Sequence, residues 1–366
     1  MNTHHDILVA NLRAHTQALA LPLGRKVGSA GHAVTRDYLL DRMKRTRLAS
    51  FRGGSFELPY RKPHPGTRKP QDFTNLVGVI PGSDRTLPPI LLGAHYDSVI
   101  AAPCADDNAT SVALNLAIAE AAALQPLERD LIIAFFDAEE PPFFLGPAMG
   151  SRRFCEDHCR DIRFAAVIVT DLIGHDASLD DLHLRLPGWA RFAAGVAFSN
   201  IGKLVAVMGA ETDGTFPAII EAAALRAKAL RVVPTQYGYV GPVSDHAAFS
   251  KAGQPFLFLS CGQGKHYHAK EDDMRWINFD KLAHITRFVS DIIARIDATP
   301  ADADRTPCDP FDLEMRMLRR ALGPAMGPVL ARFGITLPTC REDLDGLLDE
   351  VLHGIPHQTA AGPSAR

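Results

Sequence analysis

The sequence predicts an α/β fold: a mainly parallel mixed sheet flanked by helices on both faces, followed by a C-terminal helical extension. Short apolar runs alternate with helical patterns at the spacing of β–α units, which is typical of a parallel sheet. Hydrophobic residues make up 46% of the chain, enough for a large core. The 366 residues exceed what one core usually needs, so either one large domain with an appended segment or two domains are expected.

The N-terminal part of the chain predicts two helices and an irregular arm. Residues 5–20 and 31–47 carry helical patterns, with Leu39 and Met43 four residues apart on one helix face. Residues 55–73 are rich in proline and charge. They are therefore expected to form an extended arm or a loop.

Apolar runs bounded by turn residues predict the strands of the sheet. These runs are residues 74–82, 88–95, 129–140, 164–174 and 254–260. Between the second and third of them, an alanine-rich pattern predicts a closely packed helix. The middle of the chain, about 180–240, adds further strand-like runs and one helix.

The last part of the chain differs in composition from the rest. We expect a main domain over residues 1–297, a Pro- and Asp-rich linker over 298–310, and a helical extension over 311–366. The amphipathic pieces of the extension are expected to pack against the main domain or to form a surface for self-association, which leaves a homo-oligomer open.

Charge and cysteine content exclude several classes of protein. The net charge is −3 and basic residues are spread along the chain, so no nucleic-acid partner is expected. No apolar run approaches the ~20 residues that a membrane span needs, and the N-terminus lacks a secretory pattern. We therefore expect a cytoplasmic location, where the six cysteines are free thiols.

Four of the predicted strands finish on, or shortly before, side chains that bind metals. These side chains are His95 and Asp97, Glu139 and Glu140, Asp171, and His268. In open α/β sheets, sites form outside the carboxyl ends of the strands, so these groups are expected to meet at one edge. Asp106 arrives differently, just before a helix start, where the helix dipole favours an anion.

So many carboxylates in one cleft require a compensating cation. Imidazole and carboxylate without thiolate suit zinc or a similar divalent ion, and five ligands suit two ions that share a bridging carboxylate. Of the neighbours Glu139 and Glu140, one can bind metal while the other acts as a general base. Asp97 is placed to accept the second N–H of His95.

At these residues the sequence resembles the M28 family of zinc aminopeptidases. The motifs are GAHYDSV, CADDNATSVA, FFDAEE with GSRRF, VTDLIG, SDHAAFSKAGQPFLFLS and YHAKED, in the family's order over roughly residues 74–295. The resemblance implies the zinc-exopeptidase fold. It also implies two divalent metal ions, with Zn²⁺ as the expected metal, and a peptide or amino-acid amide substrate with a free amino terminus.

The resemblance also implies a role for each site residue. The metal ligands it implies are His95, Asp106 as the bridge, Asp171, Glu140 and His268. Glu139 resembles the general base that deprotonates a metal-bound water, and Tyr267 the tyrosine that steadies the oxyanion. Asp107 resembles the residue that follows a cis peptide after the bridging aspartate. The SDH motif at 244–246 resembles family scaffold near the cleft.

Departures from the family pattern leave alternatives open. Cys104 replaces a usual glycine, and the longer connection over 141–149, with Phe143 and Phe144, either walls an apolar substrate pocket or packs as a loop. This insertion and VTDLIG also resemble the glutaminyl cyclases, transferases that use one zinc and usually carry tryptophan at the position of Tyr267. A metal-free binding protein is disfavoured, because no ligand position is lost.

Overall fold

The structure is a computed structural model that describes residues 3–178, 201–322 and 337–348. The strands in these ranges are β1 (Ala49–Ser50), β2 (Glu57–Pro63), β3 (Pro70–Ile80), β4 (Ile90–His95), β5 (Leu131–Phe136), β6 (Ala166–Thr170), β7 (Leu204–Met208), β8 (Arg231–Thr235) and β9 (Phe256–Ser260). The α-helices are α1 (Thr3–Leu19), α2 (Ala30–Arg45), α3 (Thr110–Leu124), α4 (Gly150–His158), α6 (Phe216–Arg226), α7 (His246–Lys251), α8 (Phe279–Asp297), α9 (Phe311–Leu322) and α11 (Arg341–Leu348). Each apolar run that predicted a strand contains one.

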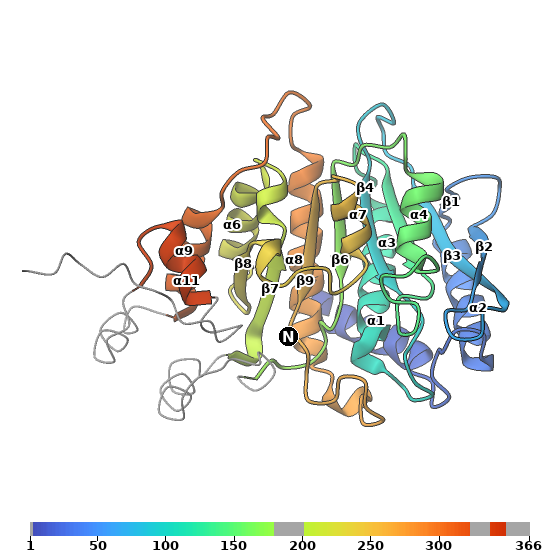
Figure 1. The fold of residues 1–366 in the computed structure, drawn as a ribbon. Helices are drawn as coiled ribbons and strands as arrows, with labels where there is room; N and C mark the ends of the chain where they lie inside the picture. Colours follow the sequence, from blue (N-terminus) through green and yellow to red (C-terminus); the bar gives the residue numbers. More distant parts are fainter. Residues whose placement is uncertain (1–2, 179–200, 323–336, 349–366) are drawn as a thin grey trace, which may run out of the picture.

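The described strands form one mixed sheet (Figure 1). Its order is β1-β3-β5-β4-β6-β9-β7-β8, with β2 paired to β3. The central strands β5, β4, β6 and β9 run parallel, so their carboxyl ends open at the same edge. Towards the two sides, β3 joins β5 and β7 joins β9 in antiparallel fashion. The predicted mixed α/β sheet is confirmed, and its parallel part is the part that positions the site.

Helices cover both faces of the sheet, and the central strands alternate between two cores (Figure 1). Ile90 and Leu92 of β4 belong to the core that α1, α3, α6 and α8 cover. Leu91 points the other way, into the core with Phe154 of α4 and Phe249 of α7. Because both faces are buried, β4 reads as a continuous apolar run rather than an alternating one.

The segment 55–73 is an antiparallel hairpin at one side of the sheet, so the prediction of an arm or loop is wrong for most of it. The pairing of β2 with β3 runs from Glu57 opposite Leu76 to Pro63 opposite Pro70. The two prolines face each other at the loop end of the hairpin, where β2 ends and β3 begins. There, a missing N–H interrupts no central ladder of the sheet.

The C-terminal extension packs against the main domain where it is described. Residues 298–310 contain no helix or strand, as expected of the predicted linker. They lead to α9, which lies against β8 and contributes Leu313 and Met317 to the larger core (Figure 1). Residues 323–336 and 349–366 of the predicted extension lie outside the described residues. The boundaries of the main domain, linker and extension stay a prediction.

Two further expectations concern thiols and membranes. All six cysteines are free, and four of them are buried. Among the described helices, none has both the length and the apolar character that a bilayer crossing demands.

Candidate metal centre

The edge formed by the carboxyl ends of the parallel strands gathers the predicted ligands. His95 is the last residue of β4, and Asp171 directly follows β6. Glu139 and Glu140 lie in the turn after β5, and His268 lies in the loop after β9. The structure therefore brings together four of the five predicted metal ligands, along with the predicted base Glu139.

The fifth predicted ligand, Asp106, does not face this cluster; its neighbour Asp107 does. Asp107 Oδ1 lies 3.4 Å from His95 Nε2, and Asp107 Oδ2 lies 3.3 Å from His268 Nε2. Asp106 instead accepts hydrogen bonds from the Gly174 N–H and from His175 Nδ1, each at 2.6 Å. The expectation that Asp106 holds the shared position is therefore corrected to Asp107.

The local backbone explains this correction. Residues Ala105–Ala109 form a distorted turn before α3, in which Asp107 has non-helical angles (φ −106°, ψ 86°). The cis peptide bond lies between Asp107 and Asn108, one bond later than the resemblance implied. Asp272 fixes the turn by accepting from the backbone N–H groups of Asp106 and Asp107, at 2.9 and 3.0 Å. A regular helical spacing therefore does not apply to these side chains.

On one side of Asp107, His95 and Asp171 form the first half of the site. Asp171 Oδ1 lies 3.6 Å from His95 Nε2, and its Oδ2 accepts from the Ser244 hydroxyl at 2.8 Å. Glu139 Oε2 lies 3.9 Å from the same imidazole nitrogen. Three acidic side chains therefore face one nitrogen of His95.

On the other side, His268 and Glu140 form the second half. Glu140 Oε2 lies 3.1 Å from His268 Nε2, and Glu140 Oε1 accepts from the Val99 N–H at 3.1 Å. His95, Asp107 and Glu140 each offer an atom within 4.8 Å of the others, as a metal centre requires. Asp107 therefore stands between two sets of ligands.

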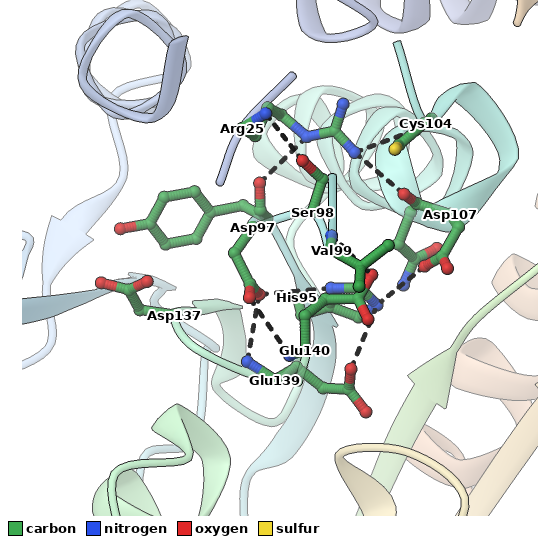
Figure 2. Close-up of polar contacts among 12 residues, drawn as sticks. Arg25, His95, Asp97, Ser98, Val99, Cys104, Asp107, Asp137, Glu139 and Glu140 are labelled. Atoms are coloured by element: carbon green, nitrogen blue, oxygen red, sulfur yellow. Dashed lines mark hydrogen bonds and ion pairs between the residues drawn. The ribbon is translucent and has the colours of Figure 1, made fainter. Parts of the chain in front are cut away.

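Asp97 contacts both halves of the site from the side of His95 that faces away from Asp107 (Figure 2). Its Oδ1 lies 3.4 Å from His95 Nδ1, the nitrogen that faces away from Asp107. Its two oxygens also accept from the backbone N–H groups of Glu139 and Glu140, each at 3.1 Å. Asp97 thus lies on the predicted side of the His95 ring, and it positions the two glutamates as well.

The polar atoms that face the centre fit a metal rather than a hydrogen-bonded core. His95 Nε2, Asp107 Oδ2, Asp171 Oδ1 and His268 Nε2 are buried, and none has a hydrogen-bond partner among the described residues. Buried polar atoms are normally paired, so four such atoms turned toward one centre call for another ligand. Imidazole nitrogens and carboxylate oxygens form the donor set of Zn²⁺ and similar ions.

The pKa values of these groups reflect the crowding of acidic side chains at the centre. Burial raises the pKa of Glu140 to about 8 and raises that of Glu139 well above its ordinary value. Burial alone would lower the pKa of His268, but the negative charges of Asp107 and Glu140, which stabilise the protonated imidazole, raise it to about 10. Without a cation, the site must hold protons that its carboxylates would otherwise release.

Several supporting residues were not predicted from the sequence. Asp245 is fully buried, and burial raises its pKa to about 7. Arg25, also fully buried, donates to the backbone carbonyls of Cys104 and Asp107, at 2.9 and 3.1 Å (Figure 2). The SDH motif pointed to Asp245 only as scaffold, and no pattern around Arg25 distinguishes it from a surface arginine.

A cavity of about 420 Å³ opens beside the centre. Its lining includes Glu139 and Glu140 together with apolar side chains such as Met208. Phe144 lines it, whereas Phe143 is buried in a separate small core with Phe73. Within the connection over 141–149, Phe144 therefore borders the cavity and Phe143 packs inside the loop.

Tyr267 stands at the border of this cavity. Its ring stacks on that of His268, with 3.7 Å between the centroids. Tyr267 is 37% exposed and is part of the cavity lining.

This chain is similar in sequence or in fold to several known proteins. A leucine aminopeptidase 1 from Pyrenophora teres f. teres is 27% identical over 300 residues, which cover 76% of this chain and 67% of that protein. A Zn-dependent exopeptidase from Parabacteroides distasonis is 18% identical, with a TM-score of 0.57 over 78% of this chain and 97% of that one. A glutaminyl cyclase from Porphyromonas gingivalis is 19% identical, with a TM-score of 0.58 over 79% and 98%.

The two solved structures share the fold of this chain, a sheet flanked by helices. The family model described as "Peptidase family M28" matches residues 75–293, more than half of the 366 residues and the whole span from β3 to α8 that carries the site. The chain therefore belongs to peptidase family M28.

Proposed function

We propose that this protein is a dinuclear metallo-aminopeptidase that releases the N-terminal residue of peptides or amino-acid amides. One observation carries the proposal: the two carboxylate oxygens of Asp107 face two different imidazoles, His95 at 3.4 Å and His268 at 3.3 Å. A carboxylate between two histidines, each with a further acid beside it, suits two ions rather than one.

The residues divide into two ligand sets around the shared Asp107. His95 and Asp171 would hold one ion, and Glu140 and His268 the other. When bound, such ions lower the pKa of a water molecule and polarise a carbonyl group, which supplies the nucleophile and the electrophilic pull that amide hydrolysis needs. Zn²⁺ is the proposed ion, in keeping with this donor set.

Glu139 is the proposed general base. It lies beside His95 without belonging to either ligand set, and its backbone N–H is fixed by Asp97. In this role Glu139 takes the proton of the attacking water and passes it to the amine that leaves. Tyr267, at the border of the cavity, donates its hydroxyl hydrogen to the oxygen that becomes negative at the substrate carbonyl.

The test compares the wild-type protein with Glu139→Gln after both are loaded with zinc. We expect the wild type to release the N-terminal residue from a panel of amino-acid amides. The kcat of Glu139→Gln is expected to fall at least ~10²-fold, because a positioned general base accelerates a reaction ~10²–10⁴-fold. It should keep two bound ions per chain by elemental analysis. Unchanged activity in this variant would remove Glu139 from its role.

A glutaminyl cyclase activity with one zinc is the second candidate. The likeness to the Porphyromonas gingivalis enzyme covers 98% of that chain. A glutamine-initiated peptide separates the candidates, because cyclisation removes ammonia whereas hydrolysis removes a residue. One ion per chain with loss of ammonia would favour the cyclase, and two ions with loss of a residue would favour the peptidase.

A further inference from the structure

The outer wall of the cavity beside the metal centre is a short segment between β8 and α7. It contributes Tyr239, Val240 and Val243 to the lining. Val240 and Val243 are 41% and 43% exposed, so they present apolar surface to the open cavity. Within this segment Tyr237–Tyr239 form one turn of 3₁₀ helix, and Gly241 has a positive φ of 77°. A segment with so little regular structure depends on outside contacts for its position.

The inner side of this segment is held by the main domain. The Tyr237 N–H donates to Glu211 Oε1 at 2.8 Å, and the Tyr237 ring packs edge-on against His246 and Phe256. His246 Nε2 lies 3.2 Å from the Gly241 carbonyl oxygen. These contacts fix the base of the wall and leave the ring of Tyr239 to other partners.

The partners of Tyr239 come from the C-terminal extension, about a hundred residues later in the chain. Its hydroxyl accepts a hydrogen bond from Arg341 Nη1 at 2.8 Å and donates to a carboxylate oxygen of Asp345. Both partners lie on α11, beyond the 75–293 span that matches the family. The extension therefore touches a residue that lines the cavity.

Arg341 is itself tied to α9 and to the linker before it. Its guanidinium pairs with Glu314, a buried residue of α9, and its Nε donates to Asp309 Oδ1 at 3.0 Å. The other oxygen of Glu314 accepts from the backbone N–H of Gln236 at 3.0 Å. Glu314 and Arg341 thus hold the segment 236–243 at two points, the backbone N–H of Gln236 and the hydroxyl group of Tyr239.

Charge and burial make this contact more than an exposed ion pair. The Arg341 side chain is 16% exposed and that of Glu314 5%, so water screens their attraction only partly. Removing one partner of such a pair leaves the other buried without its counter-charge, which loosens whatever the pair holds. For Arg341, that is the segment 236–243.

We propose that the C-terminal extension is part of the substrate-binding machinery, and that Arg341 is a positioning residue that holds the apolar wall of the cavity. The inference rests on the proposed function for the nature of the substrate. Besides the acids, the cavity lining includes the apolar side chains of Leu204, Met208, Val240 and Val243. Such a wall favours substrates with a large uncharged N-terminal side chain over small or charged ones.

The experiment compares two substitutions of arginine by methionine in the extension of the full chain. Arg341→Met removes the contact to the wall. Arg316→Met is the matched control, because Arg316 pairs with Glu221 on α6 at 2.7 Å and lines no part of the cavity. Tyr239→Phe keeps the ring and the other bonds of Arg341 but removes both hydroxyl contacts, which covers the case that Arg341→Met releases the extension as a whole.

Two readouts are measured on all three variants and the wild type. Hydrogen–deuterium exchange over residues 236–243 should rise in Arg341→Met and Tyr239→Phe and stay unchanged in Arg316→Met. The ratio of kcat/KM for leucine amide over alanine amide should fall about tenfold in the first two, the discrimination that one to two lost methylene contacts account for. Unchanged exchange in both variants overturns the proposal, and raised exchange with an unchanged ratio overturns the role in selectivity.

Failure of the proposed function is distinguishable from failure of this inference. A zinc-loaded wild type that cleaves no amide refutes the aminopeptidase assignment. The exchange measurement needs no substrate, and it still decides whether the extension holds residues 236–243.

Discussion

Replacement of Arg25 by methionine tests how the chain holds the bridging carboxylate in place. Arg25 is fully buried, and its guanidinium donates five hydrogen bonds to backbone carbonyl oxygens. The acceptors are Leu19, Tyr96, Pro103, Cys104 and Asp107, at distances of 2.8 to 3.1 Å. Four of them lie between the end of β4 and the turn that carries Asp107 (Figure 2). The arginine therefore ties this loop to the end of α1.

The size of the effect follows from these contacts. A hydrogen bond from a charged donor contributes about 1.5–3 kcal/mol, but burying the guanidinium costs several kcal/mol in desolvation. Methionine avoids that cost and leaves the carbonyls without a donor. Each buried carbonyl left without a donor costs about 1–3 kcal/mol, and the relief of desolvation offsets part of the sum, so we expect a net loss of about 3–5 kcal/mol in the free energy of unfolding. Because the free energy of unfolding of a domain is about 5–15 kcal/mol, this loss is a large share of the total stability.

The assay is urea unfolding followed by circular dichroism, together with a zinc titration of the folded protein. Zinc affinity should fall about 10- to 100-fold in Arg25→Met, as it does when residues that orient a ligand are lost. Arg61→Met is the control, because Arg61 pairs with Asp72 on the surface with its side chain 67% exposed, and its unfolding curve should match that of the wild type. A stability within about 1 kcal/mol of wild type and full zinc affinity in Arg25→Met would refute the reasoning.

Three further predictions concern the centre and its surroundings. Asp107→Asn should lose bound zinc by elemental analysis while Asp106→Asn keeps it, since only Asp107 faces both imidazoles; the reverse result would restore the original assignment. Asp97→Asn should weaken zinc binding about 10- to 100-fold in a competition titration, because it lies at the second nitrogen of His95. Burial lowers the pKa of His246 from 6.5 to about 4, so the unfolded chain takes up this proton first as the pH falls. The stability that is present above pH 6.5 is therefore lost as the pH falls to about 4. His246→Phe should remove up to about 3 kcal/mol of this loss in unfolding curves measured at a series of pH values. An unchanged pH dependence would contradict this.

Hydrophobic patterning was enough to predict the central strands and the edge at which the site forms. The runs that became β4, β5, β6 and β9 are short, apolar and bounded by turns, so their type can be read from local residues alone. Parallel neighbours then deliver their final side chains to a common edge. This is why the convergence of His95, Glu140, Asp171 and His268 could be expected before any coordinates.

The hairpin over 55–73 shows where the same reasoning fails. Its prolines and charges resemble those of a loop, and pairing along β3 decides the outcome. A strand at the side of a sheet needs a partner more than it needs an apolar sequence, and the partner lies outside the window that a local pattern covers.

The choice between Asp106 and Asp107 was beyond sequence reasoning for a related reason. Two adjacent carboxylates at the start of a helix have the same composition and nearly the same position. A distorted turn, held by Asp272 some 165 residues away in the chain, points one of them to the metal centre and the other to His175. Side-chain direction within an irregular turn depends on such distant partners.

Local residue order thus decided that the central runs are strands, that helices flank the sheet, and which kinds of side chain reach its edge. The tertiary structure alone decided which of those side chains face one another, that the segment 55–73 pairs as a hairpin, that Arg25 ties down the loop before Asp107, and that Arg341 reaches Tyr239. The physical reason is that apolar periodicity reports on contacts a few residues apart. A hydrogen bond across 80 or 100 residues leaves no periodic trace in the chain, because either end can be any donor or acceptor that folding brings within about 3 Å.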